Sequence, residues 1–159
     1  MLNAFSARFS QLGGTLFGTQ SYPPDATDFS VSITRLLNLD QSQYRKDQLA
    51  GLLGTRLQFE PRRRQDIQFI FLAAHANDAK LIRPQLQFYR AINVPVYSTS
   101  QVYQPGDPAD PDLDGITFDD MPWALETSGA AADTSKAVAS LWPNNFSGNS
   151  RLYALGFDA

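Results

Sequence analysis

The chain has 159 residues, of which 43% are hydrophobic, 12% aromatic and 18% charged, and its formal net charge is -3. This length suits one domain, and the apolar content is too high for a disordered chain. The sequence contains no cysteine, which excludes disulfides, zinc–thiolate sites and thiol nucleophiles. No run approaches the roughly 20 apolar residues of a transmembrane helix, and the first residues show no signal-peptide pattern.

An amphipathic helix and a short strand are predicted at the N-terminus. The helix places apolar residues at three- and four-residue spacing: Leu2, Phe5, Phe9 and Leu12. Gly13 and Gly14 follow at once, and a glycine in the left-handed conformation ends a helix at this point. The β-branched and aromatic content of Thr15–Thr19 predicts a strand, and Pro23–Pro24 then interrupts regular structure.

Two further helices are predicted after these prolines. The first is capped by one of three polar side chains: Asp25, Thr27 or Asp28. Its apolar face has four members: Phe29, Ile33, Leu36 and Leu37. The second helix covers Gln41–Leu53 and ends at Gly54.

The middle of the chain predicts a strand–helix–strand unit. Ile67–Ala74 is almost continuously apolar, which is typical of a parallel strand covered on both faces. A helix begins at Asn77 or Asp78, and Pro84 inside it removes one hydrogen bond and predicts a kink. Val94–Thr99 is the second core strand, so the three elements form a right-handed βαβ connection.

The C-terminal third predicts two strands and one helix separated by loops. Gln104–Asp114 is rich in proline and aspartate and is predicted as a loop, followed by a short strand over Gly115–Phe118. Thr127–Asp133 is small and polar and is predicted as a surface loop. Asp133 caps a helix that runs to Trp142, and Arg151–Leu155 is a last strand.

This order of elements predicts an α/β fold with a mostly parallel sheet. The chain opens with a helix whose apolar face needs a sheet, and it closes just after a predicted strand. We therefore expect residues 1–159 to form a single α/β lobe that is a fragment of a larger domain.

Charge is distributed unevenly along the chain. Arg35–Arg90 holds ten basic and five acidic residues, whereas Asp107–Ala159 holds two basic and nine acidic residues. The overall acidity argues against a general nucleic-acid binder, which needs a basic footprint. Arg62, Arg63 and Arg64 precede the core strand and are candidate residues for binding an acidic partner. A solvated edge is the alternative interpretation of this charge run.

Polar side chains follow both core strands. His75, the single histidine, follows the first strand, and Ser98 and Ser100 end the second. Open α/β sheets place ligands at the carboxyl ends of their strands, so these three residues are candidate ligand-binding residues. Alternatively, they satisfy backbone groups of the turns. No G-x-S-x-G elbow surrounds either serine, and His75 has no nucleophile partner in the sequence.

The remaining motifs do not predict a catalytic or metal site. Four aspartates in the proline-rich loop suggest calcium, but the EF-hand glycine and glutamate are not at their positions. A solvated acidic loop is the better interpretation. Asp119 and Asp120 are adjacent, so in an extended segment they point to opposite faces. We therefore expect no catalytic residues, no metal and no cofactor.

Seven segments together resemble one protein family. In chain order they are Phe59–Ala73, Ala79–Tyr89, Pro95–Ser100, Leu113–Ile116, Met121–Trp123, Leu141–Pro143 and Arg151–Ala159. They resemble the C-terminal domain of the LppC/LpoA family, outer-membrane lipoproteins that activate a bifunctional penicillin-binding protein. The arginine-rich segment and the R-L-Y-A-L-G-x-D-A ending are the most specific of these similarities.

The resemblance implies one lobe of a type I periplasmic-binding-protein-like fold, with helices on both faces of the sheet. It also implies a non-enzymatic regulator that binds and activates a bifunctional penicillin-binding protein, a peptidoglycan synthase. The full-length lipoprotein would lie on the periplasmic face of the outer membrane, held by a lipid anchor outside this soluble chain. The alternative is a small-ligand-binding lobe of a periplasmic-binding-protein-like receptor, and a hydrolase is the third hypothesis.

Overall fold

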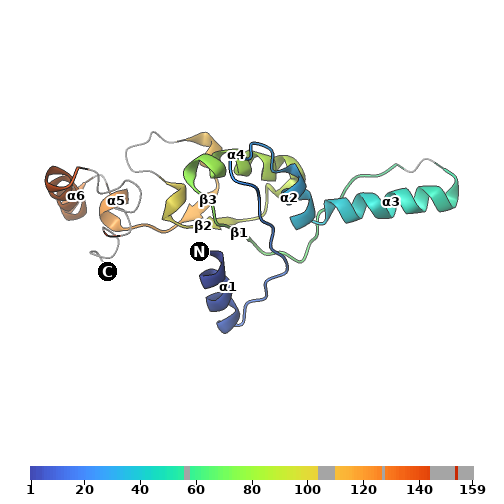
Figure 1. Cartoon of the computed structure of the whole chain (residues 1–159), viewed down its shortest axis with the longest axis horizontal. Helices are drawn as coiled ribbons and strands as arrows, with labels where there is room; N and C mark the ends of the chain where they lie inside the picture. Colours follow the sequence, from blue (N-terminus) through green and yellow to red (C-terminus); the bar gives the residue numbers. More distant parts are fainter. Residues whose placement is uncertain (56–57, 104–109, 127, 144–152, 154–159) are drawn as a thin grey trace.

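The computed structural model describes residues 1–55, 58–103, 110–126, 128–143 and 153. A small sheet lies near the centre, and helices extend from it toward both ends of the longest axis (Figure 1). The elements in chain order are α1 (Leu2–Gln11), α2 (Ser30–Leu36), α3 (Leu39–Leu53), β1 (Ile70–Leu72), α4 (Ala76–Leu86), η1 (Gln87–Ala91), β2 (Val96–Ser98), η2 (Ser100–Val102), η3 (Pro111–Leu113), β3 (Ile116–Phe118), α5 (Pro122–Leu125) and α6 (Gly129–Leu141).

The sheet is parallel, with the strand order β1-β2-β3. Ile70 pairs with Val96, which pairs with Ile116. The predicted α/β class and the β1–α4–β2 unit are therefore confirmed, as is the short strand at β3. The core strands are shorter than their apolar runs, because β2 turns into η2 after three paired residues and leaves β1 without a longer partner.

One face of the sheet carries the main hydrophobic core. Ile70, Leu72 and Val96 are buried there against Ile82 and Leu86 of α4. The predicted face of α2 joins the same cluster through Phe29, Ile33 and Leu37. Alternation along a strand sends these residues to one side of the sheet and their neighbours to the other.

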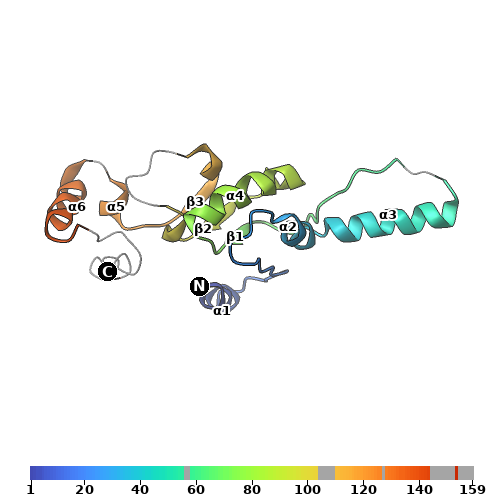
Figure 2. The same ribbon diagram turned by 45° about the horizontal axis from the view of Figure 1, so that its top comes forward.

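The opposite face of the sheet is covered by α1. Phe71 points away from the α4 side, and the ring of Phe5 stacks on it with centroids 3.8 Å apart. Phe69 meets the rings of Phe9 and Tyr97 edge to face, each at 5.5 Å. Figures 1 and 2 show α1 and α4 on opposite sides of the sheet, which confirms helices on both faces.

α3 projects away from the sheet as an arm (Figures 1 and 2). It begins after Asn38, whose backbone is left-handed with φ 55°, and it ends at Gly54 with φ 62°. Its end was predicted at this glycine, which adopts that conformation without a Cβ clash. The arm carries exposed apolar side chains near its tip, including Leu52, which is 83% exposed.

The predicted strand over Thr15–Thr19 is wrong. The segment is irregular and runs past β1, and within the described residues no backbone hydrogen bond joins the two. Leu16 and Phe17 remain largely exposed instead of packing as strand residues. The flanking Gly14 and Gly18 favour open backbone, and a five-residue strand has little stability without a hydrogen-bonded neighbour.

The kink predicted at Pro84 is displaced along the chain. α4 continues through this proline to Leu86, and the irregularity follows in η1, where the helical path is kinked. Within η1, Arg90 adopts φ 67° and Tyr89 also leaves helical geometry. The missing N–H of the proline is thus tolerated, and the helix breaks only where the chain reverses toward β2.

Near the C-terminus, α6 begins five residues earlier than predicted. The loop over Thr127–Asp133 and the cap at Asp133 are wrong for the described residues, because α6 starts at Gly129. The three alanines after this glycine have the highest helix propensity of any residue, which accounts for the earlier start. The predicted strand Arg151–Leu155 lies outside the described residues apart from Tyr153. Residues 104–109 of the predicted loop Gln104–Asp114 also lie outside them.

Candidate functional site

The arginine-rich segment before β1 is fixed to the junction between α2 and α3. The backbone N–H of Arg64 donates to the carbonyl of Leu37 at 3.0 Å. Leu37 is fully buried, so this hydrogen bond ties the segment to the core. The arginine-rich segment is therefore held at the base of the α3 arm. Its position in the sequence does not reveal this neighbour.

Arg64 is engaged with its own chain. Its Nε and Nη2 donate to the two carboxylate oxygens of Asp66, each at 2.7 Å. Its Nη1 donates to the carbonyl of Phe17 at 3.4 Å, and its guanidinium lies 5.2 Å from the centroid of the Phe17 ring. The hydrogen bonds to Arg64 lower the pKa of Asp66, and the same pair raises the pKa of Arg64.

Arg63 is also engaged, with backbone groups. Its Nε donates to the carbonyl of Arg90 at 3.0 Å, and its Nη1 donates to the carbonyl of Arg64 at 2.9 Å. Arg90 is the left-handed residue of η1, so Arg63 links the segment to the end of the α4 helix. The triplet was predicted either to bind an acidic partner or to form a solvated edge. Arg63 and Arg64 have an additional role, because both side chains organise the surrounding backbone.

Arg62 differs from its two neighbours because its side chain is exposed, and like them it lines a polar pocket. This pocket has a volume of about 530 Å³ and lies between the segment and the start of α3. Its described lining includes four arginines, the predicted triplet and Arg45 of α3, against one carboxylate, Glu60. Glu60 is paired with Arg90 at 2.6 Å, so its charge is already compensated. Sequence reasoning missed Arg45, because only the fold brings α3 beside the triplet.

The polar residues at the carboxyl ends of the strands have separate environments. Ser98 is buried, and its hydroxyl donates to the carbonyl of Leu72 on β1 at 2.6 Å. His75 is exposed, and its carbonyl accepts the N–H of Ala79 in the first turn of α4. Ser100 is half-buried and begins η2. Parallel pairing brings all three to one edge of the sheet, but Ser98 already bonds the neighbouring strand.

Asp110, one of the acidic loop residues that the structure describes, is engaged within the protein. Asp110 accepts the backbone N–H of Asp112 at 3.0 Å and pairs with Lys80 at 3.0 Å. These interactions, first the hydrogen bond to Lys80, lower the pKa of the Asp110 carboxyl. In the described part of the chain no group of three or more histidine, aspartate or glutamate side chains is arranged to hold a metal ion.

A second residue that sequence reasoning missed is Arg83, which is buried on α4. Its Nε donates to the carbonyl of Asp114 at 2.9 Å, and burial lowers the pKa of its guanidinium. Gly115 follows with φ 80°, and a Cβ at this position would collide with the guanidinium. The pair therefore fixes the approach of the chain to β3.

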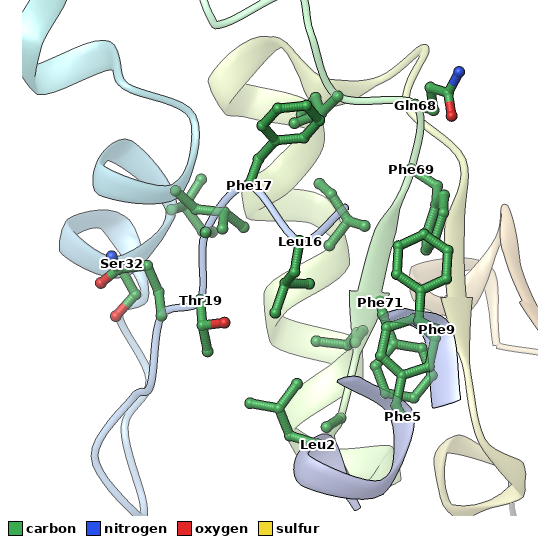
Figure 3. Close-up of a pocket in the computed structure, with 18 of the residues that line it drawn as sticks. Leu2, Phe5, Phe9, Leu16, Phe17, Thr19, Ser32, Gln68, Phe69 and Phe71 are labelled. Carbon is green, nitrogen blue, oxygen red and sulfur yellow. The ribbon is translucent and has the colours of Figure 1, made fainter. Parts of the chain in front are cut away.

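A larger apolar cavity of about 690 Å³ lies between α1, β1 and the irregular segment that follows α1. Phe5, Phe9 and Phe71 form one side of it, and Leu16 and Phe17 come from the other (Figure 3). This space separates the predicted strand over Thr15–Thr19 from β1. Its lining is mainly apolar and can accommodate an apolar group, and its two charged side chains, Arg64 and Asp66, pair with each other.

Comparison with known proteins decides the family. A model of the family described as "LppC putative lipoprotein" matches residues 1–159. This chain belongs to the LppC family. Its relatives include proteins named "Penicillin-binding protein activator LpoA" from Vibrio vulnificus, at 28% identity over the whole chain, and from Vibrio cholerae, at 29% identity over 85% of it. A protein of the same name from Photobacterium profundum is 28% identical over the whole chain. The predicted family resemblance is confirmed.

The LppC chain described here spans about a quarter of the length of these curated relatives, 26% of the Vibrio vulnificus protein and 22% of the Vibrio cholerae protein. The relatives are named as activators and not as enzymes. No solved structure matches the chain, so the type I periplasmic-binding-protein-like lobe stays a prediction. Among the described residues, no helix combines the length and apolar character needed to cross a membrane.

Proposed function

We propose that this LppC-family chain is part of a non-enzymatic regulator that binds and activates a bifunctional penicillin-binding protein. The observation that carries the proposal is the family match over all 159 residues, together with relatives named as penicillin-binding protein activators. In this proposal the full-length lipoprotein acts from the periplasmic face of the outer membrane.

The arginine-rich segment supplies the contact surface in this proposal. Arg62, Arg63 and Arg64 lie in a segment that the Arg64–Leu37 backbone hydrogen bond ties to the core, and the side chain of Arg63 donates to two backbone carbonyls. A fixed cationic surface favours association with an acidic protein, because less side-chain freedom is lost on binding. By contrast, the buried hydroxyl of Ser98 is directed at a neighbouring strand and supports the sheet.

A direct binding measurement tests the proposal. The full-length protein is immobilised, and a bifunctional penicillin-binding protein and its separately produced domains are passed over it. We expect saturable binding to the intact synthase and to one of its domains, and no binding to a monofunctional penicillin-binding protein. Absence of saturable binding to the intact synthase would contradict the proposal.

A small-ligand-binding lobe is the second candidate function. It is favoured by one observation, the exposed His75 and half-buried Ser100 at the carboxyl edge of the parallel sheet. Thermal unfolding with added L-glutamate, L-leucine or N-acetylglucosamine tests it. A rise in the melting temperature that the His75→Ala variant loses supports this role, and an unchanged melting temperature with all three probes argues against it.

A further inference from the structure

We propose that the polar pocket at the base of α3 binds an acidic peptide segment of the partner synthase, and that Arg45 and Arg62 pair with its carboxylates while Arg63 and Arg64 position the pocket wall. This inference rests on the proposed function and names the chemistry of the contact. It divides the arginine triplet into one residue that meets the partner and two that hold the surface in place.

The division follows from the hydrogen bonds of the four arginines. Arg63 donates to two backbone carbonyls, and Arg64 forms a bidentate pair with Asp66. Neither guanidinium is free to turn toward a partner without losing these bonds. In the ranges that the structure describes, no hydrogen bond or salt bridge engages the side chains of Arg45 and Arg62. Both are exposed, and both line the same pocket.

The charge of the pocket selects an anionic occupant. Its single described carboxylate, Glu60, is occupied by Arg90, so the two unengaged arginines leave a local positive charge. Guanidinium groups bind carboxylates through paired hydrogen bonds, which gives geometric selectivity as well as attraction. A volume of about 530 Å³ accommodates a few side chains but not a folded element. A short acidic segment fits these limits.

The pocket is held open by the fold before a partner arrives. The hydrogen bond from Arg64 to Leu37 fixes the segment, and the left-handed Asn38 sets the direction in which α3 leaves α2. Arg45 lies in the second turn of α3 and Arg62 in the segment before β1, so the two cations are presented by separate elements. The fold therefore fixes the backbone positions that carry the two cations, although their side chains are not held by hydrogen bonds among the described residues.

Charge reversal in the full-length protein tests the inference. We expect Arg45→Glu and Arg62→Glu each to weaken binding to the bifunctional synthase about tenfold, with the double variant weaker still. The affinity of the wild type should fall from low to high salt, and the affinity of the double variant should change much less. The matched control reverses two exposed cations elsewhere, Arg8→Glu with Lys136→Glu on α1 and α6, and retains wild-type affinity.

Further arms separate the possible results. The neutral pair Arg45→Gln with Arg62→Gln is expected to bind with intermediate affinity, and it keeps the test valid if charge reversal disturbs folding. Soluble poly-L-glutamate is expected to compete with the synthase for the wild type but not for the double reversal variant. If the wild type binds and the charge reversals do not change its affinity, this inference alone is overturned. If the wild type does not bind, the proposed function is overturned as well. Arginine-dependent binding to phosphatidylglycerol vesicles, without loss of synthase binding, assigns the pocket to a membrane and also overturns the inference.

Discussion

Phe5 of α1 and Phe71 of β1 stack with parallel rings whose centroids lie 3.8 Å apart. This contact joins the N-terminal helix to the face of the sheet that α4 leaves uncovered. α1 itself contains no fully buried residue, so its attachment depends on the aromatic cluster that Phe5 and Phe9 form with β1 and the residue before it. The cluster also forms one side of the apolar cavity.

Removing the ring of Phe5 should weaken the attachment of α1 to the sheet. Phe5→Ala is expected to lower the free energy of unfolding by about 2 kcal/mol, because it removes a partly buried ring and its stacking partner contacts. Urea denaturation measures this loss. Phe88→Ala is the matched control, since Phe88 is 79% exposed, and it should change stability by less than about 0.5 kcal/mol. Equal effects of the two substitutions would contradict the role of the aromatic cluster.

Ser98 is predicted to act in folding and not in partner binding. Ser98→Ala removes the buried hydrogen bond to the Leu72 carbonyl and should cost about 1 kcal/mol of stability. Binding to the synthase should be unchanged. The exposed Ser140, which donates to the Ala137 carbonyl, provides a control in Ser140→Ala, with little change expected in either measurement. Loss of synthase affinity in a folded Ser98→Ala protein would contradict this assignment.

The pair of Arg64 and Asp66 predicts a specific pH dependence. Hydrogen bonds from Arg64 hold the pKa of Asp66 below its ordinary value of 3.8, so the folded state binds this proton more weakly than the unfolded chain. The resulting stabilisation is fully present above the unfolded value and is lost as the pH falls through the lower folded value. Melting temperatures of the wild type and Asp66→Asn should therefore differ at pH 7 and converge as the pH falls below 3.8. A constant difference across this range would contradict the pairing.

Substitution by alanine is expected to change stability in opposite directions at Gly115 and Gly51. Its φ of 80° and its contact with the buried Arg83 leave no room for a methyl group, so Gly115→Ala should cost about 2 kcal/mol or more. Gly51 lies inside α3 with open space around it, and Gly51→Ala should stabilise the protein by about 0.5 to 1 kcal/mol. Chemical denaturation of both variants measures these changes, and a loss at both positions would show that the local argument is wrong.

Local periodicity predicted much of the fold. The shared face of Phe29, Ile33 and Leu37 is the face that α2 buries, and the apolar runs on either side of α4 form the central strands. These signals are carried by neighbouring residues along the chain. The irregular course of Thr15–Thr19 was not predictable in this way, because a strand forms only where another strand pairs with it.

The candidate site was only partly predictable for a similar reason. The arginine triplet stands out as a charge run. Its sequence does not show that Arg63 and Arg64 bind backbone and carboxylate groups, whereas the side chain of Arg62 has no such partner among the described residues. Arg45 gives no signal at all, since it joins the pocket only through the turn between α2 and α3. Which of several charged residues meets a partner is thus a tertiary property.

The rate of glycan-chain polymerisation by a bifunctional penicillin-binding protein tests the central claim most directly. The full-length protein is added to the purified synthase with its lipid-linked substrate, and the polymer is followed over time, with the protein alone as a parallel sample. The account predicts a faster rate with both proteins present and no product from the regulator alone. An unchanged synthase rate at concentrations where the two proteins bind, or polymer made or cleaved by the regulator itself, would contradict it.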